Sequence, residues 1–363
     1  MHSEAATGWG GQEIRVFQES HLLLERGHRV TIVCPPGTPL AEHCSSLTHP
    51  NFKFHLVDMN RAFSLFSIWP LYQLIQSDRP DILHTHSSND SWLVSICGKW
   101  MDIPIVRSRH VSIPVKNYFP RNWVYSFPDS IITSGLAIQT LIREVNGVSP
   151  ETVVSVDAGV DLRRFDYNCS AESVRQELKM EPGQPLIGKI AVIRRWKGHD
   201  IFLEAIPWVI EKYPNARFAI VGGGPGYQEI KEKVRNRKLD SMVFVLGHRE
   251  DIPEIMAALD VQVQASTAGE GTPQVIAQAF AMKTPLVGTR VGSIPEVFGE
   301  GRRGILVEPA NARALSDGIL KLLHQPDLRR QVVEAAYRYC LENLTIDKMM
   351  DKTTAVYESV LNR

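Results

Sequence analysis

The sequence lacks long apolar runs, an excess of charge of either sign, and a leader-like start. No stretch approaches the roughly 18–20 apolar residues that a membrane-spanning helix needs. Forty basic and forty acidic side chains cancel over 363 residues, which argues against a protein that binds nucleic acid through bulk positive charge. Residues 1–11 contain no basic segment, apolar centre or small-residue cleavage site, so no signal peptide is predicted.

Cysteine is also scarce, and several motifs of common enzyme classes are missing. The five cysteines are dispersed without a Cys-x-x-Cys pair, which is typical of reduced thiols in a cytoplasmic protein. A zinc site would need clustered Cys and His ligands, and the sequence clusters none. It also contains no Asp-x-Asp pair, no GxSxG and no GxxxxGK[ST]. We therefore expect no metal and no cofactor, and hydrolase and nucleoside-triphosphatase functions lose most of their support.

The pattern that is present is an alternation of short β-branched runs with segments of helical periodicity. It occurs in both halves and predicts an α/β protein with two doubly wound parallel sheets covered by helices. The strands are expected at 30–34, 52–57, 81–84, 103–106 and 130–133 in the first half, and at 186–193, 218–221, 243–246, 261–264, 286–288 and 305–307 in the second.

The stretch 161–184 is polar and lacks a strand-like run, and Pro182-Gly183 lies near its end. We therefore expect an N-terminal Rossmann-like domain over 1–163, a linker over 164–184, a C-terminal Rossmann-like domain over 185–345, and a last helix within 346–363.

The start of the first domain is unusual. Residues 1–11, MHSEAATGWGG, show no strand-like run. A glycine turn that opens a helix in a doubly wound sheet normally follows a central, buried first strand. We expect that first strand to be absent from this chain, with an atypical start of the domain as the alternative.

The strongest local signal is STAGEGTPQVIAQ at 266–278, which follows an expected strand and opens a helix expected over 273–282. Thr272 can cap this helix, and Pro273 suits its first position.

The start of this helix is a candidate anion site. Backbone N–H groups of Gly271, Thr272 and Gln274 would face outward with the positive end of the helix dipole, where phosphate is the usual occupant. Glu270, at the lip, could hold sugar hydroxyls. The alternative is a well-capped helix that binds nothing.

Two further segments of the second half follow expected strands. Gly222–Gly226 (GGGPG) looks like a nucleotide turn without the GxGxxG spacing, and a tight turn that needs positive φ explains it as well. Arg194, Arg195 and Lys197 follow the strand at 186–193, where basic side chains can neutralise a pyrophosphate. A solvated surface cluster is the alternative.

The first half offers weaker polar candidates. Glycines near the start of this half would let the backbone approach a ligand closely. Imidazole or guanidinium groups that directly follow expected strands could bind a sugar. Each of these histidines, taken alone, is more often structural. The candidates are Gly8, Gly10, Gly11, His84, His86, Arg107, Arg109 and His110.

Two aromatic stretches, at 63–72 (FSLFSIWPLY) and 116–127 (KNYFPRNWVYSF), could touch a membrane surface. Packing of these faces onto the sheet or the other domain is the alternative.

Together, these segments resemble glycosyltransferase family 4, the retaining enzymes with the two-domain GT-B fold. The order and spacing of the pieces are jointly specific over nearly the whole chain. They are GWGGQE–RVFQESHLLLERGHRVTIV, PDILHTHS, PIVRSRH, VDAGVDLRRF, RWKGHDIFLEAI, AIVGGGPG, LGHREDIPEIMAALDV, EGTPQVIAQAFAMKTPLVGTRVGSIPE and GILVEP.

The resemblance implies a nucleoside-diphosphate sugar bound mainly by the second domain, an acceptor on the first, and a last helix that crosses back to the first domain. Arg194 and Lys197 would hold the diphosphate, and Glu270 would face the donor sugar as the first carboxylate of the family's Glu-x7-Glu element. His110 would lie beside the transferred sugar.

The remaining donor-binding residues are also assigned through the resemblance. Backbone N–H groups at the helix start would contact the phosphates, the glycine loop would close over the donor, and the turn after the strand at 243–246 would lie near the base. These residues are Gly271, Thr272, Pro273 and Gln274; Gly10 and Gly11; His248 and Arg249; and Gly223 and Gly224.

Two positions depart from the family pattern. The second Glu of the Glu-x7-Glu element, which normally holds the ribose hydroxyls, is Gln278 here. An amide loses the charge-assisted part of that hydrogen bond, so we expect about tenfold weaker donor affinity. The usual Arg-to-Lys spacing would place the Arg at Val192, and we infer that Arg194 takes its role.

The sequence therefore predicts a retaining, metal-independent hexosyltransferase that uses a UDP- or GDP-linked sugar. Its acceptor would be a glycan or lipid-linked molecule of lipopolysaccharide, exopolysaccharide or other cell-surface glycan synthesis. It would be cytoplasmic, with peripheral contact at the inner membrane as an option, and would not bind nucleic acid. The alternatives are a non-catalytic sugar-nucleotide-binding protein and a GT-B-fold UDP-sugar epimerase.

Overall fold

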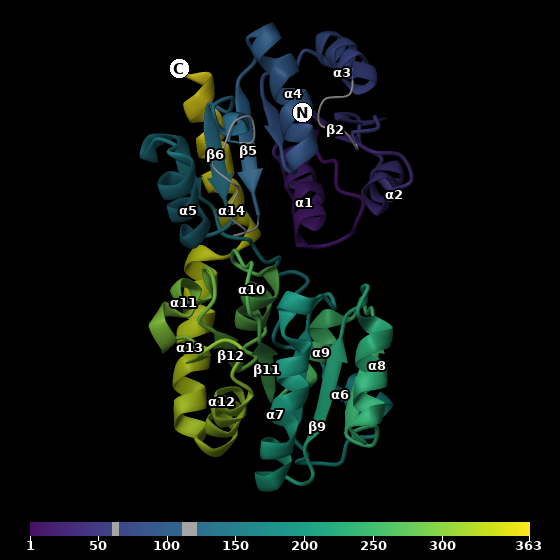
Figure 1. Ribbon diagram of the computed structural model, residues 1–363, viewed down its shortest axis with the longest axis vertical. Helices are drawn as coiled ribbons and strands as arrows, with labels where there is room; N and C mark the ends of the chain where they lie inside the picture. The colour runs from purple at the N-terminus through teal and green to yellow at the C-terminus, as the bar shows by residue number, and fades with distance from the viewer. Residues whose placement is uncertain (60–64, 111–121) are drawn as a thin grey trace. The chain divides into compact units, whose positions relative to one another are not determined.

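The computed structural model describes all residues except 60–64 and 111–121 (Figure 1). The chain forms two compact units: residues 1–157 with 347–363, and residues 158–346. Each unit is a parallel sheet with helices packed against it, as the alternating pattern predicts. The stretch predicted as the linker contains helix α6 (Glu172–Glu177) and belongs to the second unit.

The first unit contains a seven-stranded parallel sheet in the order β3-β2-β1-β4-β5-β6-β7. The strands are β1 (His2–Ser3), β2 (Val30–Cys34), β3 (Phe52–Leu56), β4 (Leu83–Thr85), β5 (Ile105–Arg109), β6 (Ser130–Thr133) and β7 (Val153–Ser155). The helices are α1 (Gly11–Glu25), α2 (Pro39–Ser46), α3 (Leu65–Asp78), α4 (Ser88–Met101), α5 (Leu136–Asn146) and α14 (Ile346–Leu361).

The prediction that the first strand is absent is wrong. Strand β1 is present at the centre of the sheet, where it pairs in parallel with β2 and β4 and places His2 opposite Ile32 and His84. It is only two residues long, too short to leave a periodic signal in the sequence. The backbone ladders on both sides, rather than local propensity, hold it in place.

The second unit contains a six-stranded parallel sheet in the order β10-β9-β8-β11-β12-β13. The strands are β8 (Leu186–Ile190), β9 (Arg217–Val221), β10 (Val243–Gly247), β11 (Val261–Gln264), β12 (Leu286–Thr289) and β13 (Ile305–Val307). The helices are α6, α7 (His199–Lys212), α8 (Tyr227–Asn236), α9 (Ile252–Ala258), α10 (Gln274–Ala281), α11 (Ile294–Val297), α12 (Ala312–His324) and α13 (Pro326–Asn343).

Helices cover both faces of this second sheet, so its strands are apolar on both sides. Alternate residues of β8 divide between two cores: Leu186 and Ile190 pack with α9 and α10, whereas Ile187 packs with α7 and α12. The same two-sided burial explains why β8 is mostly apolar in the sequence, with Lys189 as its one charged residue.

Helix α10 begins one residue later than predicted. Pro273, with φ −61° and ψ 127°, is extended and occupies the N-cap position, so the first helical residue is Gln274. Thr272 is therefore not the cap residue, and Pro273 is not at the first helical position.

The two aromatic stretches are described only in part, because residues 63–64 and 116–121 lie outside the described residues. Within α3, Leu71 is buried and Trp69 is 62% exposed. No helix in the described part of the chain is both long and apolar enough to cross a membrane.

Candidate functional site

In each sheet the strand order reverses direction at one point. The reversal lies between β8 and β11 in the second unit and between β1 and β4 in the first. Ligands of doubly wound folds bind at the carboxyl ends of the strands at such switch points. Polar side chains that do not belong to the hydrophobic cores lie at both positions.

At the second unit's switch point, two of the predicted catalytic residues form an ion pair. Lys197 ends the short 3-10 turn Arg195–Lys197 after β8, and Glu270 lies in the loop that joins β11 to α10. Lys197 Nζ lies 2.6 Å from Glu270 Oε1. The Glu270 side chain is 6% exposed and that of Lys197 is 21% exposed, so solvent screens the pair only weakly.

Neighbouring polar groups from the end of β11 and the loop after it complete the surroundings of Glu270. Its Oε1 also accepts a hydrogen bond from Ser266 Oγ, and Gln264 Nε2 lies 3.4 Å away. A buried carboxylate with three donors on one oxygen is fixed in orientation. The arrangement presents the carboxylate in a defined position at the end of the sheet.

The loop that carries Glu270 is fixed by backbone contacts as well. Thr289 Oγ1 donates to Ser266 O at 2.6 Å, and Thr267 N donates to Trp196 O at 2.8 Å. Gly292, at φ +56°, packs so closely that a Cβ there would lie 1.9 Å from Glu270 O. Only glycine fits this contact, so the backbone of Glu270 is held from behind.

A second lysine lies in the same region without a hydrogen-bond partner in the described part of the chain. Lys189 of β8 is fully buried. Burial, together with the neighbouring charge of Lys197 and against that of Glu270, lowers the pKa of Lys189 to about 7. The region therefore holds the Lys197–Glu270 ion pair and a second, fully buried amine.

The predicted phosphate-binding segment lies directly after Glu270. Gly271 and Thr272 are buried before the helix, and α10 starts at Gln274. Gln278 lies one turn into α10 and is half-buried. The start of α10 thus follows Glu270 closely in the chain, and its role as an anion site stays a prediction.

Arg194 is placed differently from Lys197. Its side chain is exposed, and its guanidinium carbon lies 5.5 Å from the centroid of the Trp196 ring. Among the described residues, the side chains that hydrogen-bond Glu270 are those of Lys197, Ser266 and Gln264, and Arg194 is not one of them.

The glycine turn after β9 packs against the end of β8. A Cβ on Gly222, at φ +142°, would lie 2.1 Å from Ala191 O. Gly223 O accepts from Ile193 N at 2.8 Å, and Gly224 has φ +123°. Close backbone packing thus accounts for these glycines, and the turn also faces His248, whose Cβ lies 3.6 Å from a Cβ built on Gly223.

Arg249 is occupied by protein carboxylates. Its guanidinium makes two 2.8 Å contacts with Glu177 of α6 and further contacts at 2.7 and 2.8 Å with Asp251. Hydrogen bonds to these two carboxylates raise its pKa above the usual value. Arg249 therefore fixes the turn that carries the exposed His248.

In the first unit, the glycine loop is tied to the helix that it opens. Gly10 is the N-cap of α1, and its N–H donates to Glu13 Oε2 at 2.8 Å. Gly11 is the first residue of the helix. Beside it, Glu4 accepts from Ala6 N at 2.8 Å, and burial raises the pKa of Glu4 to about 8.

His110 directly follows β5 and is half-buried beside a row of buried imidazoles. His110 Nε2 lies 3.4 Å from His86 Nδ1, and His86 Nε2 lies 3.0 Å from His2 Nδ1. Burial lowers the pKa of all three imidazoles. The backbone of His86 is held by Asp90, because the His86 backbone N–H donates to Asp90 Oδ2 at 2.8 Å.

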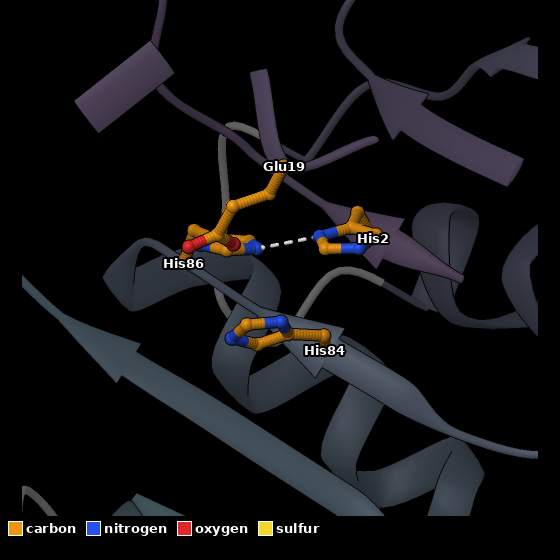
Figure 2. Close-up of side chains that lie close together, drawn as sticks. All are labelled: His2, Glu19, His84 and His86. Atoms are coloured by element: carbon orange, nitrogen blue, oxygen red, sulfur yellow. Dashed lines mark hydrogen bonds between the residues drawn. The ribbon is translucent and has the colours of Figure 1, made fainter. Parts of the chain in front are cut away.

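The structure also adds residues that sequence reasoning missed. Gln264, Ser266 and Lys189 could have been noticed as polar residues within or just after buried strands. His2 and Glu19 gave no such signal. They meet His84 and His86 only in the folded chain, as Figure 2 shows.

Two glycosyltransferase family models match the chain in tandem. The model described as Glycosyltransferase Family 4 matches residues 9–164, and the model described as Glycosyl transferases group 1 matches residues 170–339. Among curated proteins, the chain is 25% identical to N-acetyl-alpha-D-glucosaminyl L-malate synthase of Bacillus anthracis, covering 97% of this chain and 94% of that protein. It is 23% identical to an Escherichia coli alpha-1,3-galactosyltransferase that acts on a GlcNAc-diphosphoundecaprenol, covering 96% and 93%.

Solved structures show the same fold. A glycosyltransferase from Rickettsia africae superimposes with a TM-score of 0.88 at 22% identity, over 99% of this chain and 97% of that one. Anabaena HepE, solved in complex with UDP, superimposes with a TM-score of 0.86 at 18% identity, over 99% of both chains. From these matches and its two parallel-sheet domains, the chain belongs to glycosyltransferase family 4 and has the GT-B fold.

Proposed function

We propose that this protein is a retaining glycosyltransferase that moves a sugar from a nucleoside-diphosphate donor to a glycan or lipid-linked acceptor. The observation that carries the proposal is the Lys197–Glu270 ion pair at the switch point of the second sheet, in which the buried Glu270 lies just before the start of α10. A cation, a fixed carboxylate and a helix N-terminus at one position suit a diphosphate joined to a sugar.

In the proposed reaction the acceptor hydroxyl attacks the anomeric carbon on the face from which the diphosphate leaves. The bond from that carbon to the phosphate oxygen breaks, and the departing phosphate takes the proton of the hydroxyl. Lys197, Arg194 and the N–H groups at the start of α10 stabilise the charge that develops on the phosphate. Glu270 orients the donor sugar, and neither a protein nucleophile nor a metal ion takes part.

The names of similar proteins support the substrate class. HepE was solved with UDP and with UDP-glucose, and the E. coli relative transfers galactose from UDP-Gal to a diphosphoundecaprenol-linked sugar. We propose a UDP- or GDP-linked sugar as the donor and an acceptor of lipopolysaccharide, exopolysaccharide or another cell-surface glycan. A cytoplasmic protein with peripheral contact at the inner membrane would meet such an acceptor.

A panel of UDP-, GDP- and ADP-sugars tests this proposal. We expect one nucleotide class to raise the melting temperature of the chain by mass action, and its sugar to be transferred to an added acceptor with the anomeric configuration retained. Binding without transfer across donors and acceptors would instead indicate a non-catalytic sugar-nucleotide-binding protein. Conversion of the free UDP-sugar without an acceptor would indicate an epimerase.

Gln278 provides a test of how the donor is held. A Gln278→Glu substitution is expected to tighten donor binding about tenfold, because a carboxylate accepts a charge-assisted hydrogen bond from ribose hydroxyls. Calorimetric titration with the donor measures the change. A Gln228→Glu variant, on the exposed face of α8, adds the same charge to the second unit away from α10 and is the control. Equal or weaker binding by Gln278→Glu would contradict the ribose role.

A further inference from the structure

Four metal-binding side chains converge in the first unit, outside the proposed donor site. His2 comes from β1, Glu19 from α1, His84 from β4 and His86 from the residue after β4. One ligand atom of each lies within 4.8 Å of the others, and all four residues are buried. Figure 2 shows the three rings and the Glu19 carboxylate grouped together.

The donor set has the composition of a zinc site. Three imidazoles and one carboxylate are ligands that Zn²⁺ takes in tetrahedral coordination. With Zn–N bonds of about 2.0–2.1 Å, two ligands of a tetrahedron lie about 3.3 Å apart. His2 Nδ1 and His86 Nε2 are 3.0 Å apart, close to that spacing. Both rings are buried, and the hydrogen bond between their facing nitrogens is the contact that a bound ion would replace.

Glu19 supplies an independent indication of a missing partner. Its Oε1 accepts from Arg15 Nε at 2.7 Å, and its side chain is completely buried. Its Oε2 is also buried and has no hydrogen-bond partner among the described residues. Leaving a buried carboxylate oxygen unsatisfied is costly, and a cation at the centre of the cluster would satisfy it.

The surroundings resemble the outer shell of a metal centre. His84 is held on both ring nitrogens, by Tyr357 Oη at 2.6 Å and by Ser108 Oγ at 2.9 Å. Coordination would replace one of these contacts, and the other would fix the ring, as partners of metal-bound histidines do. A cavity of about 280 Å³ is lined by His2, His84 and Tyr357, so two of the four side chains border open space.

We propose that His2, Glu19, His84 and His86 form a structural Zn²⁺ site that fastens β1 to α1 and β4. Strand β1 has only two residues, so few backbone hydrogen bonds hold it at the centre of the sheet. A metal bound through His2 adds a link from β1 to both neighbouring elements. The metal stabilises the first unit, and its binding is measured without donor or acceptor, so the test does not depend on the proposed function.

Metal content and affinity of the full chain test this inference. The chain is stripped with a chelator, dialysed with Zn²⁺ and analysed by mass spectrometry for metal, while calorimetry with Zn²⁺ alone gives the affinity. We expect one Zn²⁺ per chain and a higher melting temperature with the metal. Glu19→Gln and His86→Ala are expected to bind Zn²⁺ at least about tenfold more weakly. Co²⁺ loaded in place of Zn²⁺ is expected to show the visible absorption of a four-coordinate site.

The control is His21→Ala, which removes an exposed imidazole two residues after Glu19 on the same helix and should bind Zn²⁺ like the wild type. If a variant fails to fold, the stoichiometry and the Co²⁺ spectrum of the wild-type chain decide the question. Binding below one ion per chain, or equal affinity in the wild type and Glu19→Gln, would mean adventitious metal at surface histidines and would overturn the proposal.

Discussion

A Glu270→Ala variant is expected to lose sugar transfer by at least about 100-fold while still unfolding cooperatively. Glu270 is the carboxylate that pairs with Lys197 in the described part of the chain, and it is oriented by Ser266 and Gln264. Its removal takes away the group proposed to hold the donor sugar. Without Glu270, the Lys197 amine can also pair with the diphosphate before the donor sugar is oriented, or in another position. The effect should therefore fall on turnover more than on nucleotide binding.

Initial rates with the donor identified by the panel measure this loss, and circular dichroism during heating measures folding. Glu270→Gln keeps the shape and removes the charge, so it separates loss of the carboxylate from loss of packing. Glu211→Ala removes an exposed carboxylate of α7 that pairs with Lys212, and it should retain activity. Normal turnover by Glu270→Ala would reject the proposed site.

A Gly292→Ala substitution is expected to lower the free energy of unfolding by about 2–4 kcal/mol and to reduce transfer as well. The new Cβ would lie 1.9 Å from Glu270 O, so the Glu270 backbone must move, and the positive φ of +56° adds strain. Because the displaced atom belongs to Glu270, the predicted loss of activity accompanies the loss of stability. Urea unfolding and initial rates of the same protein measure both.

Gly183→Ala is the matched control for this second prediction. Gly183 also has a positive φ, +75°, but a Cβ there would meet no atom within 4 Å among the described residues. The Gly183→Ala substitution should lower the free energy of unfolding by about 1–2 kcal/mol through backbone strain alone, and it should leave sugar transfer unchanged. If Gly292→Ala were as stable as Gly183→Ala and equally active, the close contact behind Glu270 would not position the carboxylate.

The strands of both sheets were largely predictable, because strands buried on two faces read as short apolar runs. Val30–Cys34, Ser130–Thr133, Val261–Gln264 and Ile305–Val307 have the predicted bounds. The expected strand at 186–193 ends at Ile190, since the chain turns away to bring Lys197 toward Glu270. Apolar character alone does not mark that turn.

Other elements left too weak a signal. Strand β7 (Val153–Ser155) has three residues, and α6 lies in a polar stretch with only Val174 buried. Helix α5 is amphipathic, with Ile138 and Ile142 buried one turn apart, and the pattern could have been recognised. Residues distant in the sequence pack against the polar stretch and the short strand and fix their structure. The local sequence therefore does not predict them.

For the candidate site, the sequence by itself determined the family, the alternation of strands and helices, and the segment that carries Glu270 and the start of α10. These depend on residue order and on patterns within about a dozen positions. Only the tertiary structure decided that Lys197 pairs with Glu270, that Gly292 supports it from behind, and that β1 fills the centre of its sheet. It also brought His2 and Glu19 to His84 and His86. The physical reason is that parallel sheets join strands distant in the chain, so contacts at their carboxyl ends are set by strand order and not by sequence spacing.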